Sequence, residues 1–172
     1  MVLEYAYELQ GTELFAVSQP GISWKVVLLP NNMLATASHE TGVCVWDFAT
    51  GKHLSTLAVH TDDIYDLIAW GDKLVSVSHD CTARVWDLDQ GACLYTLEHP
   101  ASVTAAAVFE DKLVTACADG LLRIWTGTVC AETFAFLDGA FRPLADGASV
   151  HSRVIILELT VVHQTFVVDK KN

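Results

Sequence analysis

Short apolar runs broken by small polar clusters recur along this chain. Residues 74–78 (LVSVS) and 83–87 (ARVWD) show the pattern well, because both contain β-branched side chains and only four residues separate them. Such runs with turn residues between them are typical of antiparallel strands joined by tight turns. No stretch keeps a helical apolar period with caps, so the pattern predicts almost no helix.

This strand pattern repeats about every forty residues. Three segments align without gaps, each around a tryptophan (Trp46, Trp86 or Trp125): residues 34–48, 74–88 and 113–127. Further strands are expected before each segment, at 23–29, 64–70 and 103–109, and after the first two, at 53–59 and 93–97. A period near forty leaves helical repeats or propeller blades, and four strands per repeat favour the blades.

Polar residues recur at fixed distances from each tryptophan. An acid lies six residues before it and a hydroxyl ten before it in all three repeats: Glu40, Asp80 and Asp119, and Thr36, Ser76 and Thr115. A histidine lies 26 residues before the tryptophan in two repeats, as His60 and His99.

Together with the Trp-Asp pair that closes the third strand, these positions resemble the WD-repeat family of β-propellers over about residues 20–137. The resemblance implies an all-β fold of four-stranded antiparallel blades. We expect a partial or incomplete propeller with three clear blades, at about 20–59, 60–98 and 99–137. A strand pair at 1–19 precedes them, and a turn-rich segment with C-terminal strands at 138–172 follows.

The resemblance also implies a hydrogen-bonded chain of four side chains inside each blade. Two complete sets are expected: His60, Ser76, Asp80 and Trp86, and His99, Thr115, Asp119 and Trp125. Buried polar groups need partners, since each unpaired one costs about 1–3 kcal/mol. The first repeat has Thr36, Glu40 and Trp46, with Pro20 where histidine belongs, so we expect it to lack the network or to hold it loosely. Thr126 replaces the usual aspartate in the third repeat.

Three recognisable repeats are fewer than the roughly four to eight blades of closed propellers. Three architectures fit: a partial propeller completed by another chain or a second copy, a small ring closed by a composite fourth blade from the two terminal strand pairs, or a fragment of a longer chain. We favour the partial propeller bound to a partner, because an open blade exposes an apolar face and strand edges.

Two chemical alternatives use the same residues. Ser76, His60 and Asp80 have the residue types of a hydrolase triad, but the same trio recurs in the next repeat, which favours a structural role over catalysis. His39, His79 and Cys81 include zinc-ligand types, yet they converge only if adjacent blades splay together, so exposed turn histidines are the favoured interpretation.

Other residues have both a packing and a binding interpretation. Trp24 and Trp70 are expected to pack between blades, with an exposed aromatic anchor as the alternative. Asp62, Asp63 and Asp66 are expected to form a solvated loop, with contact to a basic partner as the alternative.

Composition narrows the class of protein. The 172 residues are 52% hydrophobic and 18% charged, with a formal net charge of −11. A chain this apolar folds around a core, and its acidic balance argues against binding nucleic acid or anionic membranes. No secretory signal is expected at the start. Five cysteines without CxxC pairs favour buried reduced thiols in the cytoplasm, with the nucleus as an alternative.

The predicted function follows from the family resemblance. WD-repeat domains act through their loops, so we expect a non-catalytic protein–protein interaction module without cofactor or metal, a scaffold or adaptor in a multiprotein complex. The candidate interaction face contains five residues: Thr41, Asp62, Cys81, Pro100 and Leu121. The alternatives are a structural subunit that completes its propeller with another chain and, less favoured because no F-box-like helical module precedes the repeats, a substrate-recognition subunit of a ubiquitin ligase.

Overall fold

The computed structural model describes residues 3–9, 12–19, 23–38, 42–137, 140–143, 156–162 and 165–170, and every regular element in them is a β-strand. No helix in these residues has the length and apolar character that a membrane crossing requires.

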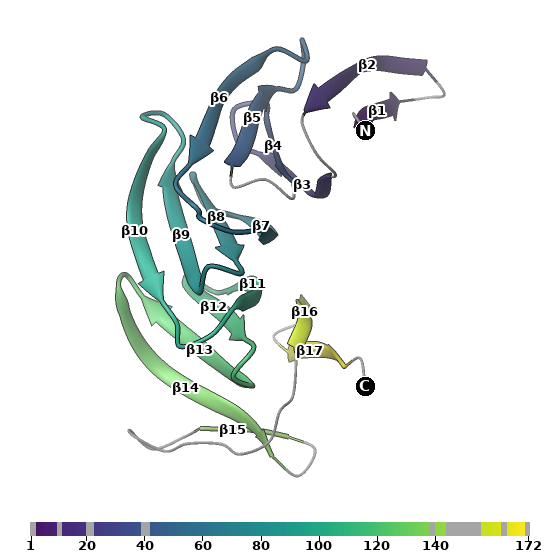
Figure 1. Ribbon diagram of the computed structural model, residues 1–172. Coiled ribbons are helices and arrows are strands. Elements are labelled where there is room, and N and C mark those ends of the chain that lie inside the picture. The colour runs from purple at the N-terminus through teal and green to yellow at the C-terminus, as the bar shows by residue number, and fades with distance from the viewer. Residues whose placement is uncertain are drawn as a thin grey trace.

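Three antiparallel sheets form the centre of the molecule and follow one another along an arc (Figure 1). The first contains β3 (Ser23–Leu29), β4 (Met33–Ser38), β5 (Gly42–Asp47) and β6 (His53–Ala58). The second contains β7 (Ile64–Trp70), β8 (Lys73–Ser78), β9 (Thr82–Asp87) and β10 (Ala92–Glu98). The third contains β11 (Val103–Phe109), β12 (Lys112–Cys117), β13 (Leu121–Thr126), β14 (Val129–Leu137) and β15 (Ala140–Pro143). Within each sheet the strands lie in chain order, as four-stranded repeats require.

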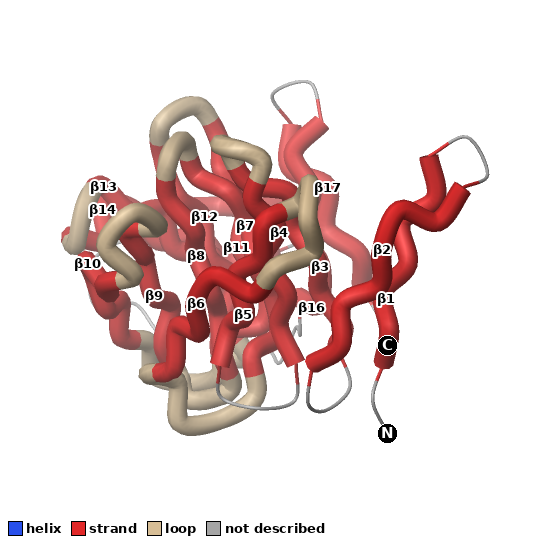
Figure 2. The backbone as a smooth tube through the Cα atoms, turned by 90° about the horizontal axis from the view of Figure 1, so that it is seen from above, coloured by secondary structure: helices blue, strands red, loops and turns tan. Residues whose placement is uncertain are grey.

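Two hairpins flank the three sheets. One pairs β1 (Leu3–Leu9) with β2 (Thr12–Gln19), and the other pairs β16 (Ile156–Val162) with β17 (Thr165–Lys170). Figure 2 shows them as separate strand pairs beside the central sheets. The hairpins belong to different sheets, so the composite fourth blade is not formed among the described strands.

The fifth strand of the third sheet is a departure from the expected four. β15 pairs with the outer strand β14, with Phe134 opposite Pro143 and Leu137 opposite Ala140. It lies in the segment that we expected to be turn-rich. Proline is tolerated on an edge strand, where its missing N–H removes no ladder bond, and Pro143 stands at the end of such a strand.

Burial along the strands explains their composition. The second strands β8 and β12 are buried at nearly every position, because each sheet is packed on both faces by its neighbours. The outer strands β6 and β10 are mostly exposed. The second strands are therefore mostly apolar, whereas the outer strands carry more polar side chains.

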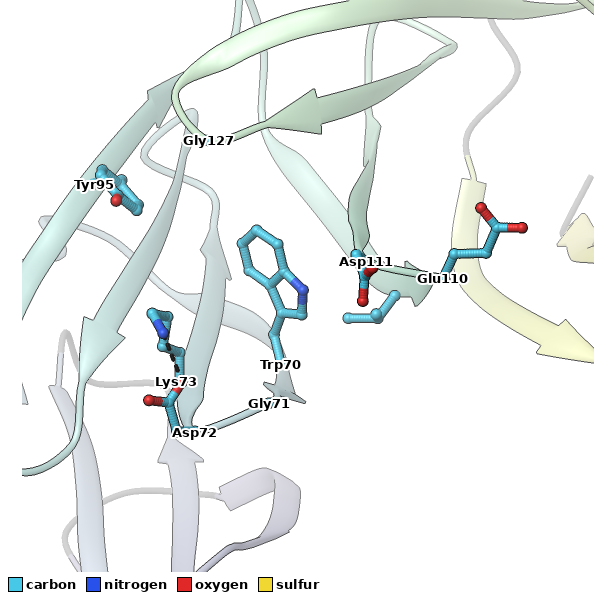
Figure 3. A pocket seen from close by; sticks show the side chains of 9 residues that line it. Trp70, Gly71, Asp72, Lys73, Tyr95, Glu110, Asp111 and Gly127 are labelled. Carbon is cyan, nitrogen blue, oxygen red and sulfur yellow. Dashed lines mark hydrogen bonds and ion pairs between the residues drawn. The ribbon is translucent and has the colours of Figure 1, made fainter.

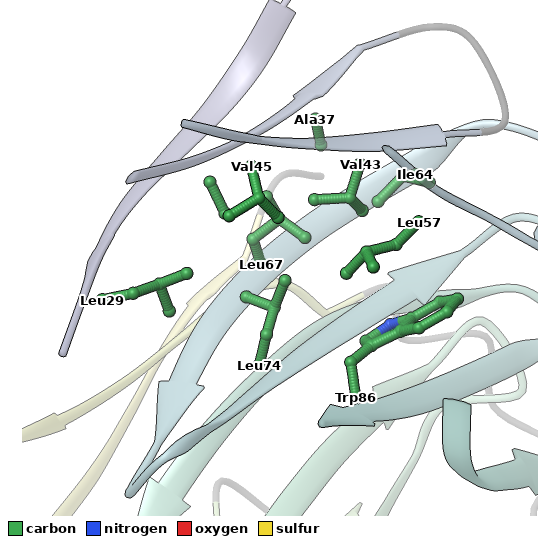
Figure 4. Packing of buried hydrophobic residues seen from close by; sticks show 10 residues of the cluster. Leu29, Ala37, Val43, Val45, Leu57, Ile64, Leu67, Leu74 and Trp86 are labelled. Carbon is green, nitrogen blue, oxygen red and sulfur yellow. The ribbon is translucent and has the colours of Figure 1, made fainter. Parts of the chain in front are cut away.

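The core is divided into layers between sheets. Leu29, Val43 and Leu57 of the first sheet meet Leu74 and Trp86 of the second in one cluster (Figure 4). Val75, Val85 and Leu97 of the second sheet meet Leu113 and Trp125 of the third in the next. Trp86 and Trp125 thus each pack against the preceding sheet. Burying a Leu, Val or Ile side chain contributes about 1.5–3 kcal/mol, so these layers fix the order of the sheets.

The acid cluster of the second repeat is divided by the structure. Asp62 and Asp63 precede β7, but Asp66 lies within β7 and is only 8% exposed. Its Oδ1 pairs with Lys25 Nζ at 2.9 Å and accepts the Leu67 N–H at 2.8 Å, and its Oδ2 accepts the Ala106 N–H at 3.2 Å. The solvated-loop interpretation is therefore wrong for Asp66, which joins the innermost strands of all three sheets.

Replacing Asp66 with asparagine tests this bridge. The amide substitutes a donor for one acceptor oxygen and removes the charge that Lys25 contacts, so we expect the free energy of unfolding to fall by about 1–3 kcal/mol. Urea denaturation measures the change. Asp89→Asn, at an exposed turn position, is the matched control; equal stabilities of the two variants would contradict the assignment.

Candidate functional site

The loops that enter each sheet and the turns between second and third strands lie at the same end of the sheets. We call this end the loop face; its described residues are 59–63, 79–81, 99–102 and 118–120. Backbone hydrogen bonds join these segments: His79 N donates to Asp63 O at 2.9 Å, and His99 N donates to Cys81 O at 2.9 Å. Ala118 N donates to Ser102 O at 2.8 Å, so these bonds extend the strand ladders of the second and third sheets into the loops. Ser102 Oγ donates to His79 O at 3.3 Å and joins the loops of the two sheets.

A buried chain of polar side chains supports the loop face in the second sheet. Trp86 Nε1–H donates to Ser76 Oγ at 2.8 Å, and His60 Nε2 lies 2.7 Å from the same oxygen. His60 Nδ1 lies 2.8 Å from Asp80 Oδ2. The indole can only donate, so every atom is satisfied when Ser76 donates to Nε2 and His60 Nδ1–H donates to Asp80. The structure thus brings together the four residues of this set.

Asp80 accepts more hydrogen bonds than the family resemblance implied. Its carboxylate accepts the Thr61 N–H at 3.1 Å, the Thr82 N–H at 2.9 Å and the Thr82 hydroxyl at 2.7 Å. Burial raises the pKa of Asp80, but the hydrogen bonds from Thr82, His60 and Thr61 outweigh it and lower the pKa to about 2. Burial is also the largest influence on His60 and lowers its pKa. A neutral imidazole therefore donates to a charged carboxylate at neutral pH.

The third sheet departs from the expected set. Trp125 Nε1–H donates to Thr115 Oγ1 at 2.8 Å, and His99 Nε2 lies 2.8 Å from that oxygen. His99 Nδ1, however, lies 2.9 Å from the Leu97 carbonyl oxygen. Asp119 is bound by Arg123 instead, with Nη2 at 2.6 Å and Nη1 at 3.3 Å. Arg123 thus binds the Asp119 carboxylate, and the Leu97 carbonyl replaces that carboxylate as the acceptor for His99.

The first sheet shows only part of a set. Trp46 Nε1–H donates to Thr36 Oγ1 at 2.9 Å. Glu40, Pro20 and Thr41 lie outside the described residues. The indole–hydroxyl bond is thus common to all three sheets.

Of the other candidate interaction residues, Asp62, Cys81 and Pro100 lie at the loop face, and Leu121 is the first residue of the adjoining strand β13. Asp62 and Pro100 are exposed, Cys81 and Leu121 are half-buried, and Cys81 has a positive φ of 68° in the turn after β8. Asp62 Oδ2 lies 2.8 Å from His79 Nδ1, and the Tyr65 ring packs edge-on against His79 at 5.8 Å between centroids. His79 thus has an aspartate and an aromatic neighbour. His39 is outside the described residues.

Sequence reasoning missed several of these partners. Thr82 and Tyr65 have no equivalents in the other repeats, so repetition could not mark them. Arg123 has an equivalent in Arg84, but Arg84 Nη1 donates to Thr96 Oγ1 at 3.2 Å instead. The acceptor for His99 is the backbone carbonyl of Leu97, and every residue type has such a carbonyl, so the sequence could not indicate it.

The aspartate that follows tryptophan has a separate role at the opposite end of the sheets. Asp47 accepts the N–H groups of Ala49 and Thr50, and Asp87 accepts those of Asp89 and Gln90, at 2.8–3.0 Å. These bonds organise the turns between β5 and β6, of five residues, and between β9 and β10, of four residues. The equivalent turn after Thr126 has only two residues, which explains why the third repeat needs no aspartate there.

A cavity of about 410 Å³ opens at this opposite end, between the second and third sheets (Figure 3). The Trp70 indole projects into it, with Tyr95 on one side and Glu110 and Asp111 on the other. Trp70 also packs against the core layer between the two sheets. Trp70 therefore packs between blades, as expected, and also lines the cavity. The Trp24 side chain lies outside the described residues.

All five cysteines are free thiols. Cys117 is buried, and burial is the main cause that raises its pKa to about 11. Cys130 is exposed, which corrects the expectation that the thiols are buried.

Comparison with known families identifies the repeats. The family model "WD domain, G-beta repeat" matches residues 51–87 and 91–126, and each match ends one residue after a tryptophan, Trp86 or Trp125. This chain contains WD repeats. Among curated WD-repeat relatives, the DENN domain and WD repeat-containing protein SCD1 of Arabidopsis thaliana is 35% identical over 96 residues. That alignment covers 54% of this chain and 8% of SCD1, and the chain spans less than a quarter of each curated relative that we compared.

Solved structures agree with a fold of WD-repeat blades. The computationally designed Ika8 protein matches 94% of this chain with a TM-score of 0.70 and 24% identity, over 47% of its own chain. The computationally designed Ika4 protein matches with a TM-score of 0.66 and 25% identity, over 94% of both chains. The expected fold class is confirmed: an all-β, incomplete propeller of three clear blades with additional terminal strands.

Proposed function

We propose that this WD-repeat chain is a non-catalytic protein-binding module that serves as a scaffold or adaptor in a multiprotein complex. The observation that carries the proposal is that Ser76, His60 and Asp80, which have the residue types of a hydrolase triad, form hydrogen bonds inside the blade. Ser76 is fully buried and His60 is 4% exposed, and both are held between Trp86 and Asp80. A nucleophile must reach its substrate, so this arrangement supports a structural role and leaves binding to the loops.

The loop face has the properties of a contact surface. Its segments are fixed by backbone hydrogen bonds within each sheet and by the bond from Ser102 Oγ to His79 O at 3.3 Å, which limits the conformational entropy lost on binding. Asp62 supplies an exposed carboxylate, and Tyr65 of the adjoining strand β7, 39% exposed and packed against His79, supplies an aromatic group of the kind enriched at interface hot spots. With the net charge of −11, we propose a partner with a basic contact surface.

Reversing one charge on the loop face tests the proposal. The unmodified chain is used to capture proteins from a cell extract, and quantitative mass spectrometry measures the amount of each. We expect the Asp62→Lys variant to capture at least tenfold less of these proteins. Asp111→Lys is the matched control, because it makes the same change at an exposed position on the opposite end. Equal capture by both variants, at unchanged thermal stability, would remove the loop face as the binding surface.

The alternative is a structural subunit whose propeller is completed by another chain. Among the described strands, β1 pairs only with β2 and β17 only with β16, and these unpaired strand edges favour this role because strands of another chain can pair with them. A structural subunit co-purifies with its partner in a fixed ratio, whereas a scaffold is purified alone and binds reversibly. The role in a ubiquitin ligase has no support from the described residues.

We propose the cytoplasm as the location, with the nucleus as the alternative. The five free thiols support a reducing compartment. Imaging of a fluorescent fusion of the full chain distinguishes the two.

A further inference from the structure

The two terminal hairpins correspond to opposite halves of one blade. Each blade begins with a strand that contacts the first two strands of the preceding blade: β7 contacts β3 and β4, and β11 contacts β7 and β8. β16 contacts β11 and β12 in the same way. β16 and β17 therefore occupy the first and second positions of a fourth blade.

The N-terminal hairpin occupies the two other positions. β2 directly precedes β3, just as β6 precedes β7 and β10 precedes β11. The pair β1–β2 thus precedes the first blade, just as β5–β6 precedes the second blade and β9–β10 precedes the third. It corresponds to the third and fourth strands of a blade. Among the described strands, β17 pairs only with β16 and β1 only with β2, so one edge of β17 and one edge of β1 have no partner strand.

We propose that two copies of this chain associate as a twofold-symmetric ring, in which β1 of each copy pairs antiparallel with β17 of the other. Each contact completes a four-stranded blade from two hairpins. The pair of chains then has six complete blades and two shared ones. This deepens the proposed function, because it names the partner that completes the propeller as a second copy and leaves the loop face for other proteins.

The curvature of the chain fits two copies. The match to Ika8 covers 94% of this chain but 47% of that chain, so the same arc accounts for about half of a longer chain. The match to Ika4 covers 94% of both chains. In Figure 1 the two hairpins lie at opposite ends of the arc, which favours pairing between copies over closure within one chain.

The register of the shared pair follows from the complete blades. In these blades the first residue of the second strand lies opposite the last residue of the third, as Met33 lies opposite Asp47 and Lys73 opposite Asp87. The same alignment places Thr165 opposite Leu9. Lys170 then lies opposite Glu4, and opposite charges at facing positions stabilise an antiparallel pair.

Light scattering and cross-linking together test the association. We expect the full chain to have twice the monomer mass of 18.8 kDa in solution. A water-soluble carbodiimide, which joins an amine directly to a neighbouring carboxylate, is then applied to an equal mixture of unlabelled and nitrogen-15-labelled chains. We expect cross-linked peptide pairs that join Lys170 to Glu4, in which one peptide is unlabelled and the other carries nitrogen-15.

Two variants control the experiment. Glu4→Gln should abolish the cross-link while the dimer mass remains, whereas Glu13→Gln on β2, which does not face β17, should preserve both. A monomer mass overturns the proposal, as does a dimer without mixed-isotope links between β17 and β1. Links confined to chains of one isotope would show closure within one chain and also overturn it. Asp62→Lys should leave the dimer mass unchanged, so failure of the loop face as a binding surface is distinguished from failure of the ring.

Discussion

Replacing Trp86 with alanine is expected to lower the free energy of unfolding by about 3–5 kcal/mol, which is much of the stability of an ordinary domain. Trp86 is 1% exposed and fills the layer between the first two blades. Its indole also donates the hydrogen bond that orients Ser76. The substitution therefore opens a cavity and leaves the buried Ser76, His60 and Asp80 without their anchor.

Chemical denaturation followed by circular dichroism measures this loss. His79→Ala is the control, because His79 is exposed at the loop face and its contacts are with Asp62 and Tyr65 at the surface. We expect its unfolding midpoint to stay at the wild-type value. Similar losses in both variants would mean that the assignment of buried and exposed positions is wrong.

Repetition made the blades predictable from the sequence. The three tryptophan segments mark third strands, and the expected strands before and after them coincide with β3, β7 and β11 and with β6 and β10. β15 was missed, because it adds to the outer edge of the third sheet in a segment without repeat signature. A repeat pattern reports what each blade shares and contains no signal for an addition to one blade.

The same reasoning applies to the buried polar sets. The Trp–hydroxyl and His–hydroxyl bonds follow spacings that recur, and the structure contains them. The partner of His99 depended on a competition that spacing does not encode, because Arg123 binds Asp119 with two nitrogens. Bidentate pairing between guanidinium and carboxylate is stronger than a single neutral hydrogen bond, which explains the outcome.

Asp66 shows a second limit of local sequence reasoning. Its neighbours in sequence are acids of an exposed loop, so its surroundings suggested a solvated position. The bonding partners of its carboxylate include Lys25 and the Ala106 N–H, each about forty residues away in the chain. Only the packing of the three blades side by side brings these groups together at the innermost strands, so the bridge depends on all three repeats.

Acid should destabilise the protein before its carboxylates are protonated. Burial lowers the folded-state pKa of His99 from 6.5 to about 4, and it also lowers that of His60. The unfolded chain therefore binds protons below about pH 6.5 that the folded chain excludes, and the stability present above that pH is lost as the pH falls. For His99, which is 7% exposed, the loss by pH 4 is about 3 kcal/mol.

Urea denaturation at a series of pH values between 7 and 4 measures this dependence. His99→Gln removes one of the two buried imidazoles, so the fall in unfolding free energy across this range should be about 3 kcal/mol smaller than in the wild type. The comparison uses the slope with pH, because the substitution also weakens the bond to Thr115 at every pH. His53→Gln controls for the loss of a histidine at an exposed position. A His99→Gln variant with the wild-type slope would show that His99 takes up protons in the folded blade as readily as in the unfolded chain, and that the buried imidazole is not the origin of the acid sensitivity.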